Sequence, residues 1–218
     1  MSKVKLTVFG ATCYAGGKIL EEAVRRGHEV VAVARTIDAR SFETDGVTAR
    51  QGSLHDSDFV AEVIAGADVA IVAIPARPLD GKILLEAIPA LAEAAQRHET
   101  RIGVIGGAGS LFVAEGGPRL IDTPAFPEAA RTEAGNHAEV LEAFRRLPEG
   151  VKWFYVSPAA EFGSWAPGER TGRYRVNGDV LLTDEDGNSR IGGADFAIAV
   201  LDEVEEPAHH EQRFSVAY

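Results

Sequence analysis

The chain has 218 residues, of which 45% are hydrophobic and 25% charged, and its formal net charge is -11. The acidic balance argues against nucleic-acid binding, because neutralising phosphates requires clustered Lys and Arg. A single cysteine excludes an intrachain disulfide, and no apolar stretch is long enough to span a membrane. The start of the sequence lacks the layout of a signal peptide, so we expect one globular domain, residues 1–218, in the cytoplasm.

Apolar runs alternate with helical patterns along most of the chain, which is typical of α/β proteins. Strands are expected at residues 4–9, 29–34, 47–50, 68–74, 101–105, 152–156 and 213–216, of which 29–34 is a continuous apolar run. Helices are expected at residues 18–26, 56–65, 81–98, 127–146 and 193–205. The alternation predicts a doubly wound, mainly parallel Rossmann sheet that binds ligands at the switch point beside its first and fourth strands.

Several helices carry signals at or near their ends. Gly27 is expected to end the first helix, and Asp56 or Ser57 to cap the second. Pro89 is expected to bend the long helix in which it lies.

The segment after the sixth strand departs from the alternating pattern. Residues 157–176, the first part of the segment 157–192, are polar and rich in Gly, Pro and Arg. Asn177-Gly178 and Asp186-Gly187 are turn signals flanked by strand-like residues. We therefore expect a substrate-side loop and hairpin insertion that closes over the cofactor edge of the sheet.

The first expected strand runs into a glycine turn and then a helical pattern, the layout that opens dinucleotide-binding sheets. Gly10 would make the tight turn, Gly16 would let the helix start close to the strand, and the first helical N–H groups would hold the pyrophosphate. The alternative is a purely structural turn. The predicted phosphate-binding stretch comprises Gly10, Ala11, Thr12, Cys13, Tyr14, Ala15 and Gly16.

Cys13 stands where the extended pattern Gly-x-x-Gly-x-x-Gly has its middle glycine. That glycine normally lets the backbone approach the pyrophosphate, so the Cys13 side chain is expected to crowd the ligand. The residue is interpreted either as a tolerated small side chain or as a reactive thiol at a helix N-terminus.

Arg35 follows the second strand, where NAD-binding sheets usually carry an acid that bonds the ribose hydroxyls. An arginine would instead attract the 2′-phosphate of NADP, so NADP(H) is favoured over NAD(H). The alternative is a solvated loop arginine, and Arg40 could assist or could lie on the surface. Ser53 and Leu54 follow the third strand, at the place where such sheets often recognise adenine.

Two further strand ends complete the expected cofactor site. Ala73-Ile74-Pro75 follows the fourth strand and is expected to pack against the ribose and nicotinamide. The glycine-rich residues 106–111 follow the fifth strand, where Gly107 would keep the backbone close to the nicotinamide edge. Ser110 is the candidate catalytic residue, because its hydroxyl could hydrogen-bond a substrate carbonyl or the carboxamide. The alternative is a serine of the loop turn.

A feature of ordinary short-chain dehydrogenases is missing. They carry Tyr-x-x-x-Lys on the helix after the fifth strand, where the tyrosine protonates a carbonyl. Residues 131–139 contain neither tyrosine nor lysine. His137 is either a proton donor or a packed or surface histidine. Hydride transfer to flavins or quinones remains open, because such acceptors can take their proton from water.

Two other stretches stand out by composition. Residues 168–175 contain three arginines in an acidic chain. They either meet a flavin or cofactor phosphate or form the solvated face of a hairpin. The pair His209-His210 has no nearby carboxylate spacing, so we expect surface histidines and no metal.

The motifs as a set resemble one family. They are Gly10-Ala11-Thr12 with Gly16, Arg35, Gly-Gly-Ala-Gly-Ser-Leu at 106–111, Ser-Pro-Ala-Ala-Glu-Phe at 157–162, Pro-Gly-Glu-Arg-Thr-Gly at 167–172 and the C-terminal Gln-Arg-Phe-Ser-Val-Ala-Tyr. Nearly the whole chain resembles the atypical short-chain dehydrogenases of the NAD(P)H-binding NADH-flavin reductase group. That group is similar to biliverdin reductase B and more distantly to NmrA-like proteins.

The resemblance implies a Rossmann fold, a nicotinamide cofactor and a flat acceptor such as a flavin. It implies that residues 10–16 and Arg35 hold the cofactor, that Ser110 lies beside the nicotinamide, and that Ser157, Pro158 and Ala159 line the same pocket. We therefore expect an NAD(P)H-dependent reductase of flavin or quinone-like acceptors. The alternative is a non-catalytic NADP(H)-binding redox sensor of the NmrA-like kind.

Overall fold

The computed structural model describes residues 3–37 and 44–218. Within these residues eight strands form one sheet in the order β3-β2-β1-β4-β5-β6-β8-β7. The strands are β1 (Lys5–Phe9), β2 (Glu29–Ala34), β3 (Val47–Gln51), β4 (Val69–Val72), β5 (Arg101–Ile105), β6 (Trp153–Pro158), β7 (Arg175–Asn177) and β8 (Gln212–Ala217). The helices are α1 (Tyr14–Arg25), α2 (Ser57–Ile64), α3 (Ile88–His98), α4 (Glu128–Arg145) and α5 (Gly193–Glu205), with short 3-10 turns η2 (Leu84–Ala87) and η3 (Leu120–Asp122). None of these helices is long and apolar enough to cross a membrane.

The strand order is that of a Rossmann fold, as the sequence predicts. β1 lies between β2 and β4, and the pairings from β3 across to β8 are parallel. β7, at the edge, runs antiparallel to β8. The chain order reverses between β1 and β4, which places the expected ligand crevice at the carboxyl ends of these two strands.

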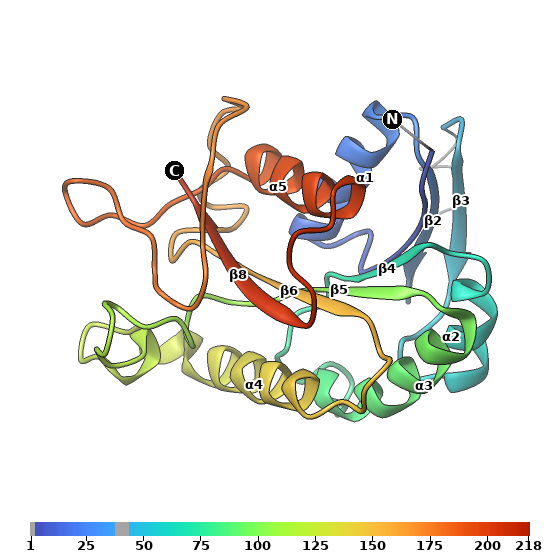
Figure 1. The fold of residues 1–218 in the computed structure, drawn as a ribbon, viewed down its shortest axis with the longest axis horizontal. Helices are drawn as coiled ribbons and strands as arrows, with labels where there is room; N and C mark the ends of the chain where they lie inside the picture. Colours follow the sequence, from blue (N-terminus) through green and yellow to red (C-terminus); the bar gives the residue numbers. More distant parts are fainter. Residues whose placement is uncertain (1–2, 38–43) are drawn as a thin grey trace.

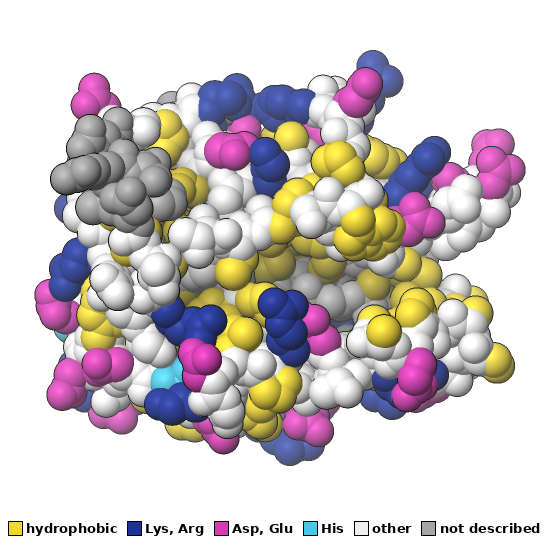
Figure 2. Space-filling view, turned by 180° about the vertical axis from the view of Figure 1, so that it is seen from behind, with side chains coloured by type: hydrophobic (Ala, Val, Ile, Leu, Met, Phe, Trp, Pro, Cys, Tyr) yellow, Lys and Arg dark blue, Asp and Glu magenta, His cyan; other side chains and the backbone are white. Residues whose placement is uncertain are grey.

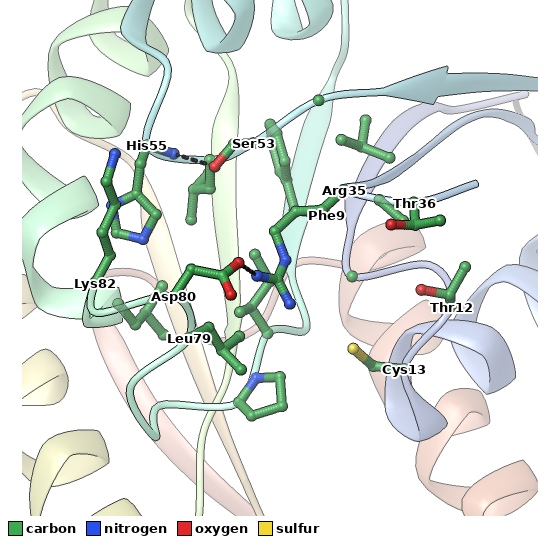
Figure 3. A pocket seen from close by; sticks show the side chains of 18 of the residues that line it. Phe9, Thr12, Cys13, Arg35, Thr36, Ser53, His55, Leu79, Asp80 and Lys82 are labelled. Carbon is green, nitrogen blue, oxygen red and sulfur yellow. Dashed lines mark hydrogen bonds and ion pairs between the residues drawn. The ribbon is translucent and has the colours of Figure 1, made fainter.

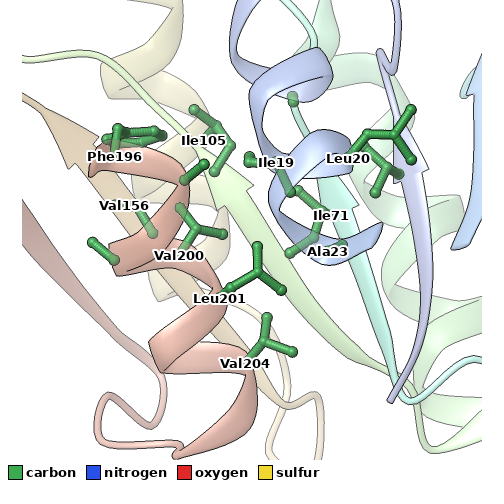
Figure 4. Close-up of a cluster of buried hydrophobic side chains, with 14 of the residues drawn as sticks. Ile19, Leu20, Ala23, Ile71, Ile105, Val156, Phe196, Val200, Leu201 and Val204 are labelled. Atoms are coloured by element: carbon green, nitrogen blue, oxygen red, sulfur yellow. The ribbon is translucent and has the colours of Figure 1, made fainter. Parts of the chain in front are cut away.

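Helices cover both faces of the sheet, with α1 and α5 on one face and α2, α3 and α4 on the other (Figure 1). Under α1 and α5, apolar side chains such as Ile19, Ile71, Val156 and Val200 form one buried cluster (Figure 4). A second buried cluster lies under α2, α3 and α4. Burial on both faces explains why the central strands are continuously apolar instead of alternating.

The helix α1 begins at Tyr14, four residues before the predicted start at Lys18. Gly16 and Gly17 lower the helix propensity of this stretch, which is why the sequence pattern suggests a later start. Cys13 is the N-cap residue, in an extended conformation with φ −79° and ψ 162°. The helix therefore follows the glycine turn directly, and its unpaired first N–H groups lie next to that turn.

The other helix ends agree with their sequence signals except at Pro89. Gly27, with φ +79°, follows the end of α1. The Asp56 side chain caps α2 by accepting the N–H of Phe59 at 3.1 Å. Pro89 lies in the first turn of α3, after the 3-10 turn η2, so it starts this helix instead of bending a longer one.

The insertion after β6 consists mostly of loops, and its pairing differs from the predicted hairpin. β7 ends at Asn177 and pairs with the distant strand β8, not with residues beyond the Asn177-Gly178 signal. A turn does form at residues 184–187, where Gly187 has φ +83°. The mainly parallel sheet is confirmed, and its antiparallel edge arises because β7 covers the free edge of the last strand.

Candidate cofactor site

The glycine turn after β1 brings three elements into close contact. The N–H groups of Gly10 and Ala11 both donate to the carbonyl of Val33 in β2, at 2.9 and 3.1 Å. Gly10 has φ +84°, and a Cβ there would lie 2.4 Å from the carbonyl oxygen of Ala73 after β4. A Cβ at Gly16 would lie 2.1 Å from the carbonyl oxygen of Gly10. Close backbone approach therefore requires both glycines, as a dinucleotide-binding turn does.

Two adjoining cavities open at the carboxyl ends of the strands. The smaller, of about 420 Å³, lies at the ends of β1, β2 and β3, and the larger, of about 760 Å³, at the ends of β4, β5 and β6. Cys13, Ile74, Pro75 and Arg77 line both cavities, which therefore join beside the start of α1. One face of the molecule is hollowed, with hydrophobic side chains gathered around the hollow and Lys and Arg at its rim (Figure 2). The two cavities form one groove across the switch point of the sheet.

Most of the predicted cofactor residues meet in this groove. Those that line the smaller cavity are Gly10, Thr12, Cys13, Arg35, Ser53, Leu54, Ile74 and Pro75. Those that line the larger cavity are Cys13, Tyr14, Ala15, Ala73, Ile74, Pro75, Gly107, Pro158 and Ala159. Successive parallel strands end at one edge of the sheet, and this brings residues distant in sequence together. The roles of these residues toward a cofactor stay predictions.

Four predicted residues line neither cavity. Ala11 and Ser157 are buried, and the Ser157 hydroxyl has no hydrogen-bond partner among the described residues. Gly16 packs under the turn. Ser110 is also buried, and its Oγ accepts a hydrogen bond from the guanidinium of Arg213 in β8 at 2.7 Å. The structure therefore does not bring the candidate catalytic serine to the groove.

The smaller cavity combines cationic side chains with a carboxylate. Among its described lining residues the charged ones are Arg35, Arg77, Lys82 and Asp80. Arg35, at the end of β2, forms an ion pair with Asp80 from the loop after β4 (Figure 3). Burial, followed by the charge of Lys82, lowers the pKa of His55 in this cavity, so its imidazole is neutral at pH 7. Arg40, which could assist Arg35, lies outside the described residues.

Glycines and aromatic rings form much of the wall of the larger cavity. Residues 106–109, at the end of β5, contribute a backbone surface, and Phe126, Phe162 and Trp165 contribute rings. Trp165 belongs to a tight turn of residues 163–166, and this residue is 69% exposed. An exposed ring at the rim of a cavity is well placed to stack on a flat ligand.

His137 of α4 lines the larger cavity and is almost fully buried. Its Nδ1 lies 3.5 Å from the hydroxyl of Tyr155, which donates a hydrogen bond to the His137 carbonyl at 3.0 Å. Burial lowers the pKa of His137 to about 4 and raises the pKa of Tyr155. At neutral pH His137 is therefore a packed, uncharged imidazole beside the groove.

The environment of Cys13 favours the interpretation as a tolerated side chain. Burial raises the pKa of its thiol, against the opposing charges of Arg77 and Arg35. Reactive cysteines need a lowered pKa, because the thiolate is the nucleophile. Its extended backbone is open to any residue, so no left-handed conformation demands glycine here.

The basic residues 168–175 hold the insertion against two helices and line neither cavity. Arg170 pairs with Glu22 of α1 at 3.2 Å. Asp195, a fully buried carboxylate in the first turn of α5, accepts the N–H of Thr171 at 2.9 Å. A contact with a cofactor phosphate would require this segment to line the groove. The structure places it elsewhere, which contradicts that interpretation.

The two histidines near the C-terminus differ in their surroundings, because His210 is exposed as predicted whereas His209 is half-buried. The His209 ring stacks on Phe214, with centroids 4.1 Å apart, and its Nδ1 lies 2.7 Å from Glu203. These contacts make His209 a packing residue between α5 and β8.

The side chains that line the groove and that sequence reasoning missed include Arg77, Asp80, Phe126 and Trp165. Arg77 lies two residues beyond Pro75, so a search that continued past the strand end would have found it. Asp80 precedes a glycine, which is a turn signal of the kind noted later in the chain. Phe126 and Trp165 lie in long loops, whose path no periodic pattern predicts.

Comparison with known proteins agrees with this geometry. A sequence model described as "NAD(P)H-binding" matches residues 10–206. The uncharacterized protein YwnB of Bacillus subtilis is 38% identical over 215 residues, which cover 98% of each chain. A solved "putative NADH-flavin reductase" from Streptococcus pneumoniae is 35% identical, with a TM-score of 0.85 over 98% of this chain and 99% of that one. A solved "putative epimerase" from Bacteroides thetaiotaomicron is 33% identical, with a TM-score of 0.89 over 100% of this chain and 98% of that one. The chain belongs to the NAD(P)H-binding family of Rossmann-fold proteins, as its motifs predict.

Proposed function

We propose that this protein is an NAD(P)H-dependent reductase that passes a hydride to a flat acceptor, a flavin or a quinone. The observation that carries the proposal is the aromatic-walled cavity that joins the glycine-turn cavity at Cys13, Ile74, Pro75 and Arg77. In this arrangement the smaller cavity takes the adenosine end of the cofactor. The larger cavity takes the nicotinamide and the acceptor. The name of the Streptococcus pneumoniae relative supports a flavin as one acceptor.

The residues present fit a dinucleotide. The space between Gly10 and Gly16 is one that a Cβ would fill, so the turn brings the start of α1 close to the pyrophosphate position. Arg77 lies where both cavities meet and supplies a positive charge there. Arg35 supplies a guanidinium at the adenosine end, which favours NADPH over NADH.

The chain's own residues bind, orient and shield the reactants. When bound, the reduced nicotinamide supplies a hydride, and the acceptor takes its proton from water. Gly107 leaves room for the ring, since a Cβ there would have His137 at 3.5 Å as its nearest neighbour. Pro158 and Ala159 provide an apolar surface that excludes water, and Trp165 is placed to stack on the acceptor. No side chain needs to act as an acid in this scheme.

The alternative function is a redox sensor that binds NADP(H) without turnover, and the surroundings of the two candidate proton donors are compatible with it. The two candidate donors are unsuited to protonate a substrate in the groove. Ser110 is buried outside both cavities, where its hydroxyl accepts a hydrogen bond from Arg213, and burial lowers the pKa of His137 to about 4. An enzyme that reduces carbonyls would need such a donor. A reductase of flavins or quinones and a sensor do not.

One experiment separates the two functions. The protein is mixed with NADPH and, in turn, FMN, FAD and menadione, and loss of absorbance at 340 nm is followed. Binding of NADPH and of NADH is measured separately by isothermal titration calorimetry. We expect turnover with at least one acceptor. Binding of NADPH without turnover would support the sensor, and absence of binding of both NADPH and NADH would contradict both functions.

A further inference from the structure

We propose that Asp80 sets the choice between NADH and NADPH by competing with the 2′-phosphate for Arg35. The inference rests on the proposed binding of a nicotinamide dinucleotide in the groove. NAD-binding sheets usually place the acidic residue that selects the cofactor at the end of β2. In this chain the inference assigns that role to Asp80, in the loop after β4.

A tight turn fixes the position of Asp80. The N–H of Leu79 donates to the carbonyl of Lys82 at 2.8 Å, and the N–H of Lys82 donates back to Leu79 at 3.0 Å. Asp80 and Gly81, the two central residues, have φ of +52° and +76°, as in the turns of tight hairpins. This doubly bonded turn presents the Asp80 carboxylate toward the guanidinium of Arg35 (Figure 3).

The ion pair places opposite charges where the two cofactors differ. NADP carries a phosphate on the adenosine ribose at the 2′ position, and NAD carries a hydroxyl there. The planar guanidinium of Arg35 suits a phosphate, whereas the Asp80 carboxylate repels a phosphate and accepts a hydrogen bond from a hydroxyl. NADPH must therefore displace Asp80 from Arg35, while NADH binds with the ion pair intact. The preference for NADPH is smaller than Arg35 alone would produce.

Other charges around the turn increase the effect of Asp80. Arg77 and Lys82 line the same cavity, and His55 is neutral there. Among the described lining residues Asp80 is thus the carboxylate that offsets the cations Arg35, Arg77 and Lys82. Its removal leaves their positive charge free for a phosphate.

The pair contributes little to folding, so its effect on binding can be measured by substitution. The side chains of Arg35 and Asp80 are 50% and 84% exposed, and exposed ion pairs contribute little to stability. Asn tolerates positive φ well, so Asp80→Asn keeps the turn while removing the charge.

The test measures dissociation constants of NADPH and NADH by calorimetry for the wild type and for Asp80→Asn. We expect NADPH to bind about fivefold more tightly to the variant, a size typical of one exposed charge. NADH is expected to bind equally or up to about threefold more weakly. Asp186→Asn is the matched control, because Asp186 also precedes a glycine in an exposed turn but lies outside the cavity. It should leave both constants within about twofold.

A second background tests the competition itself. Arg35→Ala should weaken NADPH far more than NADH, and Asp80→Asn should then improve NADPH binding less than about twofold in that background. An equal improvement with and without Arg35 would overturn competition, as would an unchanged NADPH-to-NADH ratio in Asp80→Asn alone. If the wild type binds neither nucleotide, the proposed function fails together with this inference. If it binds both and the ratio does not change, the failure is of this inference alone.

Discussion

Gly16→Ala tests whether the glycine turn depends on backbone contact at this position. Gly16 lies in the first turn of α1, and a Cβ there would lie 2.1 Å from the carbonyl oxygen of Gly10. Gly17, its neighbour in the same helical turn, offers the contrast, because a Cβ there would lie 3.5 Å from the carbonyl oxygen of Ala11. Helix propensity treats the two positions alike, whereas packing separates them.

The two substitutions are expected to shift stability in opposite directions. Replacing Gly by Ala in a helix stabilises by up to about 1 kcal/mol. Gly17→Ala should gain part of this, since its new contact is ordinary. At Gly16 the backbone must move by roughly 1 Å to relieve the contact, and overpacking of this kind costs about 3 kcal/mol. Gly16→Ala should therefore lose about 2 kcal/mol overall.

The assay is urea unfolding followed by circular dichroism. With an m-value of about 2 kcal/mol/M, the midpoint of Gly16→Ala should fall by roughly 1 M, while that of Gly17→Ala stays level or rises. The m-value should not change, because the substitutions leave the surface area exposed on unfolding nearly the same. Equal midpoints for the two variants would refute the packing argument and leave helix propensity as the explanation.

Three further variants address the acceptor wall, the buried histidine and the insertion. Trp165→Ala should raise the KM for a flavin or quinone about five- to tenfold and leave the NADPH dissociation constant unchanged, because stacking contributes about 1 kcal/mol. For His137, the unfolded imidazole takes up a proton near its ordinary pKa of about 6.5, whereas the folded one resists until about pH 4. The unfolded state thus binds more protons in this window, and wild-type stability falls as the pH drops. Between pH 7 and pH 5, the free energy of unfolding of His137→Gln should fall by roughly 2 kcal/mol less than that of the wild type. Asp195→Asn should destabilise by roughly 2 kcal/mol, since an amide N–H would face the N–H of Thr171.

Trp165→Ala and Asp195→Asn each have a control variant. Phe112→Ala also removes an exposed ring, but Phe112 lies outside the larger cavity, so KM should not change. An equal effect of Trp165→Ala and Phe112→Ala would contradict stacking. A pH dependence of stability that persists unchanged in His137→Gln would show that other groups cause it. Thr171→Ser keeps the hydroxyl that donates to Asp195 at 2.7 Å, and it should stay near wild-type stability.

The fold was predictable because its signals are local and repeat along the chain. Continuous apolar runs such as residues 69–72 lie in strands covered on both faces, and glycine at position 27 ends α1 as expected. The prediction and the structure differ where tertiary contacts override helix propensity. α1 includes Gly16 and Gly17 because close approach to the turn, not helix propensity, decides where it starts.

The candidate site was predictable where residues directly follow strands and not where long loops bring them in. Arg35 and Pro75 line the groove because parallel strands end at one edge. Ser110 lies only five residues beyond β5, yet the loop turns its hydroxyl to Arg213 of β8. The positions of Asp80 and Trp165 depend on the paths of loops, which have no periodic sequence pattern from which they could be predicted. Of the residues to which we assign specificity by proposal, the sequence pattern predicts Arg35 but not Asp80 or Trp165.

Cys13 interrupts the glycine pattern at the position where the structure places the least demand on the backbone. At Gly10 and Gly16 a side chain would meet a carbonyl oxygen at 2.4 and 2.1 Å, whereas the extended N-cap conformation of Cys13 accepts any residue. A side chain at the middle position therefore takes up space beside the turn without straining the backbone. Because burial raises the pKa of the thiol, the side chain is uncharged at neutral pH and does not repel a pyrophosphate as a thiolate would. Gly10 and Gly16 maintain the geometry of the turn. The Cys13 side chain occupies space in the groove but adds no negative charge to it.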